Sequence, residues 1–464
     1  MQIRSCLLLV ASLAVAAPAD GTDGSRPPST LDGRQAVALA LANHPRLRGQ
    51  RERLAEFRAL RGQALSRALP QVDAGLSTVR SRDPGLLNSP NFSSLADGGD
   101  GLPGFDASFL RPIPVTLYDY RLNVEQTIYA FGRISAAVRA AATREEQIRL
   151  EIRAAEIETA RQVVTALYDL ALAEARLEVL AAERAAREKQ VEQAEDFLDI
   201  GTGTRLSLLQ ARSALAALRP REIAARGEVD TARVRLNEAL GRGALEPVET
   251  TGRELSDARL PELPPLDALL AAAARRPDLA ALQTERKALD HEHQVWRAGL
   301  LPDLKFSGSW GISTIFTEEL LNADFSSWNA GVFFEWTLFD GRQTRYKLAE
   351  LRSRKRQNEW SEKTRLGEIE RDLARAAAEY RRARMAADAA LDSVALAEET
   401  LRVAQANHAW GAATTLDLLL GHQGLRAARF EQLTAVHDAL VALADVHAMV
   451  GRLPFQPLLE EASR

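Results

Sequence analysis

A stretch without a single glycine or proline runs from Ile134 to Ile200: ISAAVRAAATREEQIRLEIRAAEIETARQVVTALYDLALAEARLEVLAAERAAREKQVEQAEDFLDI. Gly132 and Gly201 bracket it, and nothing inside it breaks a helix. At about 1.5 Å per residue such a helix would be about 100 Å long, several times the mean helix of a globular domain. A compact core cannot enclose a helix of that length.

Apolar residues recur in this stretch at steps of three and four, and alanine fills much of the remainder. The recurring positions are Val163, Ala166, Leu170, Ala173, Leu177 and Leu180. This spacing is typical of a helix packed lengthwise against neighbours. The pattern favours a wall of helices running side by side, and a solvated two-stranded coiled coil is the alternative that this stretch alone leaves open.

The overall composition is that of a folded, mildly acidic protein, with 46% hydrophobic and 26% charged residues and a formal net charge of −4 over 464 residues. Arg and Lys are scattered among Glu and Asp along the helical stretches. A nucleic-acid-binding surface would gather basic residues into a patch, so no nucleic-acid partner is expected.

The N-terminus has the pattern of a secretory signal peptide. Arg4 precedes an apolar run from Cys6 to Ala17, and small residues surround the expected cleavage site after position 19. We therefore expect residues 1–19 to be removed, together with Cys6, the only cysteine, which suits an oxidising periplasm. Because Cys6 lies at the start of the apolar run and not directly after it, no lipid anchor is expected.

Four later stretches alternate between apolar and polar residues, the period-two pattern of strands. No later stretch holds 18 or more consecutive apolar residues, so a membrane crossing would have to use these strands. Tryptophans near the strand ends fit a membrane-interface belt, whereas a half-buried sheet of a soluble domain is the alternative. The candidate lipid-facing residues are Tyr118, Tyr120, Leu122, Val124, Phe306, Trp310, Trp328, Val332, Phe334 and Trp336. The second strand pair is predicted to extend to Leu338.

The second half of the sequence restates the first. Leu301-Pro302-Asp303-Leu304 matches Leu69-Pro70-Gln71-Val72, and each proline follows an earlier one by 25 residues. Gly132 to Gly201 spans 69 residues and Gly341 to Gly411 spans 70, while Gly201 to Gly241 and Gly411 to Gly451 both span 40. We therefore predict a tandem duplication, with repeats at 20–250 and 251–454 and a C-terminal tail at 455–464.

The predicted fold is mainly α with a small β part, built from long antiparallel helical hairpins. In each repeat two shorter helices, 46–68 with 206–240 and 278–300 with 416–450, would stack end to end beside the long helix, and Pro220 should kink its helix. Four strands cannot close a barrel, so the chain must oligomerise. Two copies would give eight strands with a filled lumen, whereas three would give a 12-stranded transmembrane β-barrel continued by an α-barrel.

The paired blocks, the Leu-Pro strand entries and the strand exits Tyr129-Ala130-Phe131-Gly132-Arg133 and Leu338-Phe339-Asp340-Gly341-Arg342 resemble the TolC family of outer-membrane efflux proteins. The resemblance covers nearly the whole mature chain. It implies a homotrimeric channel in the outer membrane of a Gram-negative bacterium, in contact with lipid and extending into the periplasm. It also implies a periplasmic adaptor (membrane fusion) protein and an inner-membrane RND, ABC or MFS pump as partners, in tripartite efflux or type I secretion.

The turns between antiparallel helices are the helix ends that face away from the membrane, so we expect them to meet the adaptor. They comprise Gly201, Thr202, Gly203 and Thr204 in the first repeat and Gly411, Ala412, Ala413 and Thr414 in the second. The loops near Asp83–Pro114 and Phe316–Ser327 should face the outside.

The resemblance further implies a gate just after the second turn, where family members carry acidic residues and this chain carries Asp417. Three such carboxylates would repel one another, raise their pKa values and attract cations. The chain departs from the pattern because a second acidic position is Leu420 and the matching position in the first repeat is Ser207. The gate could thus be hydrophobic in part, through Leu416 and Leu420. Alternatively, Asp417 only begins a helix, where the macrodipole favours a carboxylate.

No catalytic, cofactor or metal site is expected. Asp290-His291-Glu292-His293 is the only compact group of potential metal ligands in the sequence, and on a helix its two histidines point apart. The alternative to a channel is a periplasmic coiled-coil adaptor or scaffold, which would leave four aromatic strands in duplicate without a purpose. The sequence does not identify the exported solute.

Overall fold

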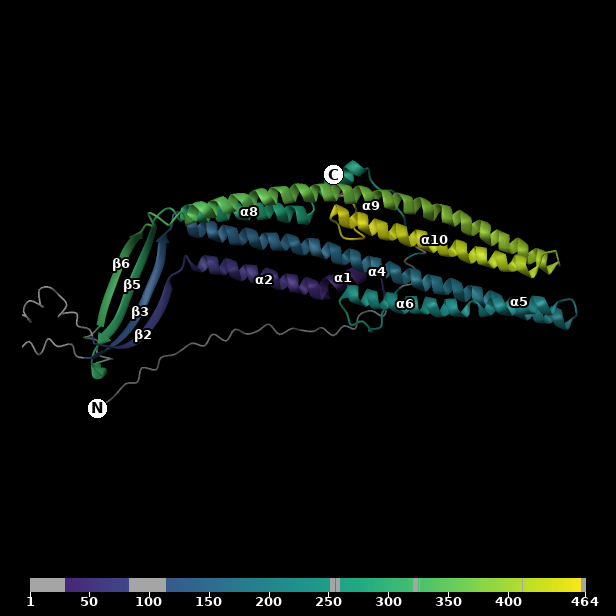
Figure 1. Cartoon of the computed structure of the whole chain (residues 1–464), viewed down its shortest axis with the longest axis horizontal. Coiled ribbons are helices and arrows are strands. Elements are labelled where there is room, and N and C mark those ends of the chain that lie inside the picture. Colours follow the sequence, from purple (N-terminus) through teal and green to yellow (C-terminus); the bar gives the residue numbers. More distant parts are fainter. Residues whose placement is uncertain are drawn as a thin grey trace, which may run out of the picture.

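The computed structural model describes residues 30–82, 114–250, 255, 259–319, 324, 326–410 and 412–459. The molecule is elongated, with a small sheet at one end and helices running away from it (Figure 1). The first repeat contains β1 (Thr30–Leu31), α1 (Gly33–Asn43), α2 (Pro45–Ser66), β2 (Gln71–Ser81), β3 (Val115–Tyr129), α4 (Arg133–Asp199), α5 (Arg205–Ala216), α6 (Arg219–Leu240) and β4 (Glu249–Thr250). The second contains α7 (Leu266–Ala273), α8 (Pro277–Ala298), β5 (Asp303–Thr314), a 3-10 turn (Thr317–Glu319), β6 (Ser326–Glu335), α9 (Gln343–Ala409) and α10 (Thr415–Val450).

The two long helices, α4 and α9, are equal in length, with 67 residues each. Two consecutive residues in the left-handed region precede each helix: Phe131 and Gly132 before α4, and Gly341 and Arg342 before α9. The glycine is the second of the pair in the first repeat and the first of the pair in the second. This offset of one residue explains why the glycine spacings in the sequence are 69 and 70 although the helices match.

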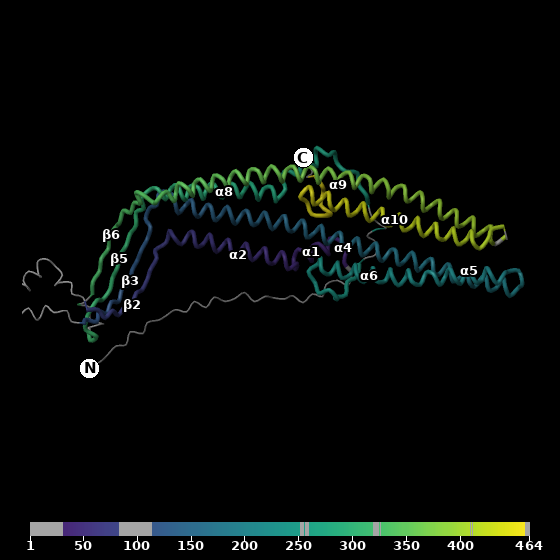
Figure 2. The backbone as a smooth tube through the Cα atoms, in the orientation of Figure 1, coloured from purple at the N-terminus to yellow at the C-terminus, as the bar shows by residue number. Residues whose placement is uncertain are grey.

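The shorter helices stack end to end beside the long ones, as the duplication predicted (Figure 2). A Cβ on Gly241, at the end of α6, would lie 2.7 Å from Cδ of Pro45, the first residue of α2. A Cβ on Gly451, at the end of α10, would lie 3.0 Å from Cγ of Arg276, next to the start of α8. Both glycines have positive φ, so each ends its helix and leaves room for the next one.

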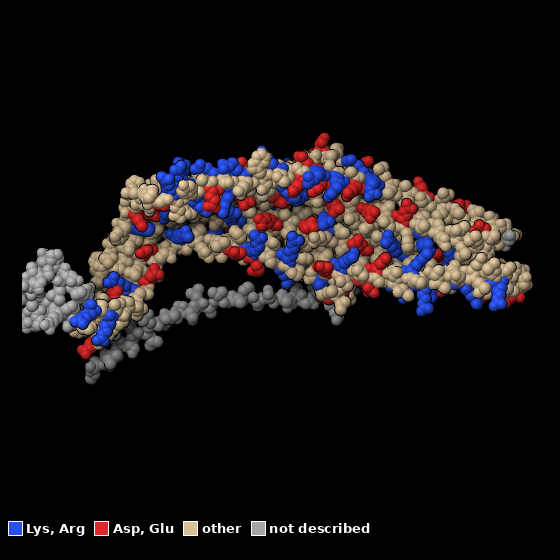
Figure 3. Space-filling view, in the orientation of Figure 1, with Lys and Arg blue, Asp and Glu red and all other residues tan. Residues whose placement is uncertain are grey.

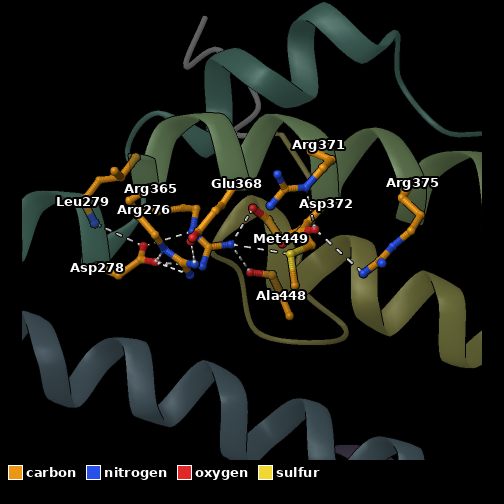
Figure 4. A network of polar contacts seen from close by, with 10 residues as sticks. All are labelled: Arg276, Asp278, Leu279, Arg365, Glu368, Arg371, Asp372, Arg375, Ala448 and Met449. Carbon is orange, nitrogen blue, oxygen red and sulfur yellow. Dashed lines mark hydrogen bonds and ion pairs between the residues drawn. The ribbon is translucent and has the colours of Figure 1, made fainter. Parts of the chain in front are cut away.

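A polar network fixes the second of these joints, where α8, α9 and α10 meet (Figure 4). Arg276 donates through Nη1 to the carbonyl oxygens of Ala448 and Met449, 3.0 and 2.8 Å away, which belong to the last turn of α10. Its other guanidinium nitrogens bind Asp278, which also pairs with Arg365 of α9. Burial raises the pKa of Asp278, but the hydrogen bonds and charges of the two arginines outweigh this and hold it below its usual range.

The helix predicted at 206–240 is interrupted, as expected from Pro220. It divides into α5 and α6 around Ala217 and Leu218, and Pro220 lies in the first turn of α6. The corresponding stretch of the second repeat is the unbroken 36-residue α10. We refer to α4, α5 and α6 as the first hairpin and to α9 and α10 as the second hairpin.

Four antiparallel strands form the larger sheet, in the order β2-β3-β5-β6. The two central strands come one from each repeat, and β2 and β6 form the edges. The strand predicted to reach Leu338 ends earlier, at Glu335. Trp336 therefore lies past the strand, where its indole Nε1 donates to the carbonyl oxygen of Leu300, 3.1 Å away, as the chain turns towards α9. Its assignment as a strand residue was wrong.

The core lies at mid-length, where α1, α4, α6 and α10 meet around Leu167, Leu170, Leu236 and Leu240, all 0% exposed. A second cluster joins α7, α9 and α10 around Leu269, Leu373 and Tyr380. The parallel pair of β1 and β4 and the helix α7, which sequence patterns did not predict, sit in this middle region. Two-residue strands are too short to show a period.

Candidate functional sites at the two ends of the molecule

The register of the sheet places most of its apolar residues on one face. Leu122 pairs with Trp310, and Trp310 pairs with Trp328. Directly paired residues lie on the same face and side chains alternate along a strand, so the even-numbered residues of the four strands share one face. The rule holds as far as an irregularity near the end of β3, where Tyr129 pairs with Leu304. The predicted residues on this face are Tyr118, Tyr120, Leu122, Val124, Phe306, Trp310, Trp328, Val332 and Phe334. Trp328 is 76% exposed in the single chain, so within the described part of one copy this end of the face is open.

The odd-numbered face is mostly polar, apart from Val79, Leu117 and Phe333, and has an excess of carboxylates. Its charged residues are Asp73, Asp119, Arg121, Glu125, Asp303, Lys305 and Glu335. Arg121 donates from Nε to Oδ1 of Asp119, 2.9 Å away on the same face. A Cβ on the paired residue Gly311 would clash with the carbonyl oxygen of Tyr120 and lie 2.9 Å from Cγ of Arg121, so this position needs glycine where β3 approaches closely.

The first tip, residues 200–207, is a tight turn between α4 and α5. The amide nitrogens of Thr202 and Gly203 donate to the carbonyl oxygen of Phe197, at 2.9 and 2.7 Å. Gly201 has a φ of +82°, and a Cβ on Gly203 would lie 2.9 Å from the Phe197 carbonyl carbon, so both positions favour glycine. Thr204 caps α5, because its hydroxyl accepts from the amide of Ser207 at 3.1 Å.

The second tip, residues 410–417, repeats this arrangement. The amide of Ala412 donates to the carbonyl oxygen of Asn407 at 2.8 Å, as Thr202 does to Phe197. Thr414 caps α10, and its hydroxyl accepts from the amide of Asp417 at 3.3 Å. Ala413 lies between Ala412 and Thr414 in this turn. Gly411 lies outside the described residues.

The predicted gate residues lie on the first turns of α10. Leu416 and Leu420 are 56% and 57% exposed, one turn apart. Asp417 completes a capping box, in which its carboxylate accepts from the backbone nitrogen of Thr414 at 2.8 Å and from its hydroxyl at 2.7 Å. These bonds, the hydroxyl first, lower the pKa of Asp417 within one chain. The rise expected from a ring of three carboxylates is a property of the assembly and stays a prediction.

A recess of about 780 Å³ separates the two tips. Phe197, Leu206, His408, Trp410 and Leu416 are among the residues that line it. Trp410 is 88% exposed, and Ile200 at the matching position of the first tip is 74% exposed. Neither residue was among the predicted site residues, although a large apolar residue directly before the glycine of a helical turn is a usable signal.

The possible metal cluster on α8 is engaged in ion pairs with neighbouring helices. Asp290 accepts from Lys355 of α9 at 2.8 Å, and Glu292 accepts from Arg144 of α4 at 3.0 Å. Among the described residues, no group of three or more His, Cys, Asp or Glu side chains is arranged to hold a metal ion. Charged side chains of both signs are interspersed over the helices on the face drawn in Figure 3.

Within the described residues, α10 is the one helix long and apolar enough to cross a membrane, but half of its most apolar stretch is buried inside the structure. Leu440 and Ala444 belong to the core around α4, and Val446 and Val450 to the core around α9. Its apolar composition is therefore that of a core helix.

Comparison with known proteins gives a family match and a fold match. A model of the family described as outer membrane efflux protein matches residues 36–242 and 269–452. The fusaric acid resistance protein FusA of Burkholderia cepacia is 26% identical over 324 residues, which are 67% of this chain and 56% of FusA. The alkaline protease secretion protein AprF of Pseudomonas aeruginosa is 25% identical over 351 residues, 72% of this chain and 70% of AprF. The match thus spans little more than half of FusA.

The solved structure of the open state of the MtrE outer membrane channel from Neisseria gonorrhoeae matches with a TM-score of 0.72 at 18% identity. That match covers 90% of this chain and 89% of MtrE. The predicted fold class, long helical hairpins with a small sheet, is thereby confirmed.

Proposed function

The chain belongs to the outer membrane efflux protein family, and from that premise we propose that three copies of it form an exit duct that carries solutes out of the cell. The protein resides in the outer membrane, as its family does. The duct would be driven by an inner-membrane pump of the RND, ABC or MFS class and reached through a periplasmic adaptor. The two sheet faces carry this proposal.

The sheet supports a lipid-facing exterior and a water-filled interior. The even-numbered face presents Trp310, Trp328 and Phe334, and the odd-numbered face presents carboxylates. A transmembrane barrel shows this alternation, apolar towards lipid and polar towards the lumen. Among the residues that the structure describes, the edge strands β2 and β6 have no further strand partner, so edge-to-edge pairing of three copies would close a barrel of twelve strands.

The helices support a duct that continues the barrel into the periplasm. Each of α4 and α9 has 67 residues, which corresponds to about 100 Å at about 1.5 Å per residue. A pair of shorter helices lies end to end beside each long helix (Figure 2). Each repeat therefore has two full-length helical tracks, the long helix and the stacked pair. Three chains would supply twelve tracks around one lumen.

The lumen would favour cations, because carboxylates exceed basic groups on the odd-numbered face. FusA is named for resistance to fusaric acid and AprF for secretion of alkaline protease, two very different substances. We therefore propose a wide duct whose cargo is selected by the pump.

Two arginine substitutions test the proposed faces. Val332→Arg places a charge on the even-numbered face, and Ser307→Arg places one on the odd-numbered face. The two positions lie close together, because Ser307 follows Phe306 in β5 and Phe306 pairs with Val332 of β6. A charge on the lipid face costs about 2–4 kcal/mol at mid-membrane, so Val332→Arg should reduce the heat-modifiable trimer in the outer-membrane fraction and Ser307→Arg should not.

Planar bilayer recordings complete the test, with the expectation of a stable, cation-selective conductance from the wild type. Equal tolerance of both substitutions, or recovery of the wild type in the soluble periplasmic fraction, would favour a coiled-coil scaffold instead.

A further inference from the structure

A histidine joins the two hairpins at the middle of α10. Nε2 of His437 lies 2.8 Å from Oδ1 of Asp169 on α4, and Nδ1 lies 3.1 Å from Oδ1 of Asp438. The imidazole is 13% exposed. Since α4 belongs to the first repeat and α10 to the second, this contact ties the two halves of the chain together.

The two carboxylates require a particular protonation state of the ring. Ionised carboxylates only accept hydrogen bonds, and a neutral imidazole has one N–H to donate. Both contacts of His437 are therefore satisfied together only when the ring carries two protons. In the neutral ring, one lone pair would face a carboxylate oxygen at about hydrogen-bond distance, which is repulsive.

The surroundings of His437 favour the charged form. Burial lowers its pKa, but hydrogen bonds and charge from Asp169 and Asp438 outweigh burial and raise it above its ordinary value. Among the described residues, the charged groups that act on His437 are Asp169 of α4 and Asp438 of α10 itself. On the α9 side, the uncharged residues Ala387 and Ala390 pack against Ala435, two positions before His437.

The other two buried histidines of α10 behave in the opposite way. Burial lowers the pKa of His447 to about 4. Burial, and then the charge of Arg187, also lower the pKa of His422. Of the three histidines of α10, His437 is therefore the one whose pKa is raised, and it is the one that bridges the two hairpins through carboxylates.

Further polar contacts run along the same line between α4 and α10. Arg161 donates to Asp445 at 3.1 Å, and Arg176 donates to the hydroxyl of Thr434 at 2.9 Å. Nearer the tips, Glu183 accepts from Arg426 at 3.1 Å. Any motion of the second hairpin against the first must break or shift these bonds, and among them the bond of His437 is the one that depends on the protonation of a histidine.

We propose that His437 is a proton-operated clamp that holds the second hairpin on the first. Protonated, it donates to Asp169 and Asp438 and fixes α10 against α4. Its pKa is raised in the folded state, so its stabilisation is complete below about pH 6.5 and is lost as pH rises through the raised value. The consequence for opening rests on the proposed channel, whereas the clamp itself does not.

The test compares the wild type with His437→Gln, which can donate to one carboxylate but cannot gain a proton. His293→Gln on α8, outside the α4–α10 contact, is the matched control. Thermal unfolding of the purified trimer and single-channel open probability are followed from about pH 6 to about pH 9. The wild type and the control should lose stability relative to His437→Gln as pH rises, and should open more often, whereas His437→Gln should open equally at all pH values.

Parallel unfolding curves for the wild type and His437→Gln across this range would overturn the clamp. Asp169→Asn is a second test. It removes one carboxylate, so stability should be lost at a lower pH than in the wild type, without loss of the fold. If the wild type conducts at no pH, the channel proposal fails, and the unfolding curves still decide the clamp.

Discussion

The two tips share one geometry and differ in charge. In each, an amide nitrogen two residues before the cap donates to a carbonyl five residues earlier, Thr202 to Phe197 and Ala412 to Asn407. In each, a threonine caps the next helix, and an exposed leucine follows two residues later, Leu206 and Leu416. The backbone of the turn has been preserved through the duplication, because helix caps and tight turns accept few alternatives.

The differences lie in what the tips present. The third helical residue is Ser207 in the first tip and Asp417 in the second, so only the second tip closes a capping box with a charge. The helix that follows is interrupted near Pro220 in the first hairpin and continuous in the second. We propose a shared docking role for the two turns and a separate gating role for the second tip.

The largest effect is expected from straining the backbone of the turn that both tips share. Gly201 has a φ of +82°, and a Cβ added there would meet no atom within 4 Å, so Gly201→Val has space but suffers backbone strain of about 1–2 kcal/mol, which should distort the tip. Export should fall to background while heat-modifiable trimers persist. Gly227→Ala in α6, where a Cβ also meets nothing, is the control and should export normally. Gly411→Val should behave like Gly201→Val, and normal export by either would remove the tips as docking sites.

The sequence predicted the helices and strands well because their signals are local and repeated. A run free of glycine and proline defines α4, and the equal spacings of landmarks in both halves define the duplication. Alternation defined the strand faces, although it continued past Glu335 to Trp336 and Leu338, where the chain already turns. Alternation does not show where a strand loses its partner.

Contacts between distant helices could not be predicted in the same way. The pairing of Asp169 with His437 joins residues 268 positions apart, and the joint of Arg276 with the end of α10 joins residues more than 170 apart. A single sequence does not predict either contact. A charged residue on a helix face has the same spacing from its neighbours whether or not it meets a distant partner. The predicted gate is harder still to derive from one sequence, since it would form only where three chains meet.

The next largest effect concerns the charge that distinguishes the tips. Asp417→Ala should abolish block of the channel by trivalent cations in bilayer recordings, because a ring of three carboxylates binds them. Ser207→Asp, which should form a capping box with Thr204, is expected to leave that block unchanged. If Ser207→Asp strengthens the block as much as Asp417→Ala weakens it, both tips line the constriction. Unchanged block in Asp417→Ala would leave Asp417 as a helix-capping residue.

A smaller effect is expected from the caps themselves. Thr204→Val and Thr414→Val each remove a side-chain cap, which costs about 1 kcal/mol. The loss should be larger at Thr414, because Asp417 loses the hydroxyl that donates to it at 2.7 Å as well. Hydrogen exchange of the first turns of α5 and α10 measures this, with faster exchange confined to the mutated tip. Equal acceleration at both tips in either variant would mean that the tips are coupled.

The smallest effect is expected where the hairpins differ in continuity. Pro220 lacks an amide hydrogen, so nothing donates from it to the carbonyl of Ala216 one turn earlier, and α5 and α6 separate at Ala217 and Leu218. Pro220→Ala restores that donor and should join them into one helix like the 36-residue α10. The gained hydrogen bond, about 1 kcal/mol, is offset by the greater freedom of alanine in the unfolded chain, about 0.4–1 kcal/mol, so stability should hardly change. Slower hydrogen exchange around Leu218 without a change in export would show that the interruption is a consequence of the proline alone. A loss of export would show instead that the first hairpin needs its bend to place its tip beside the second.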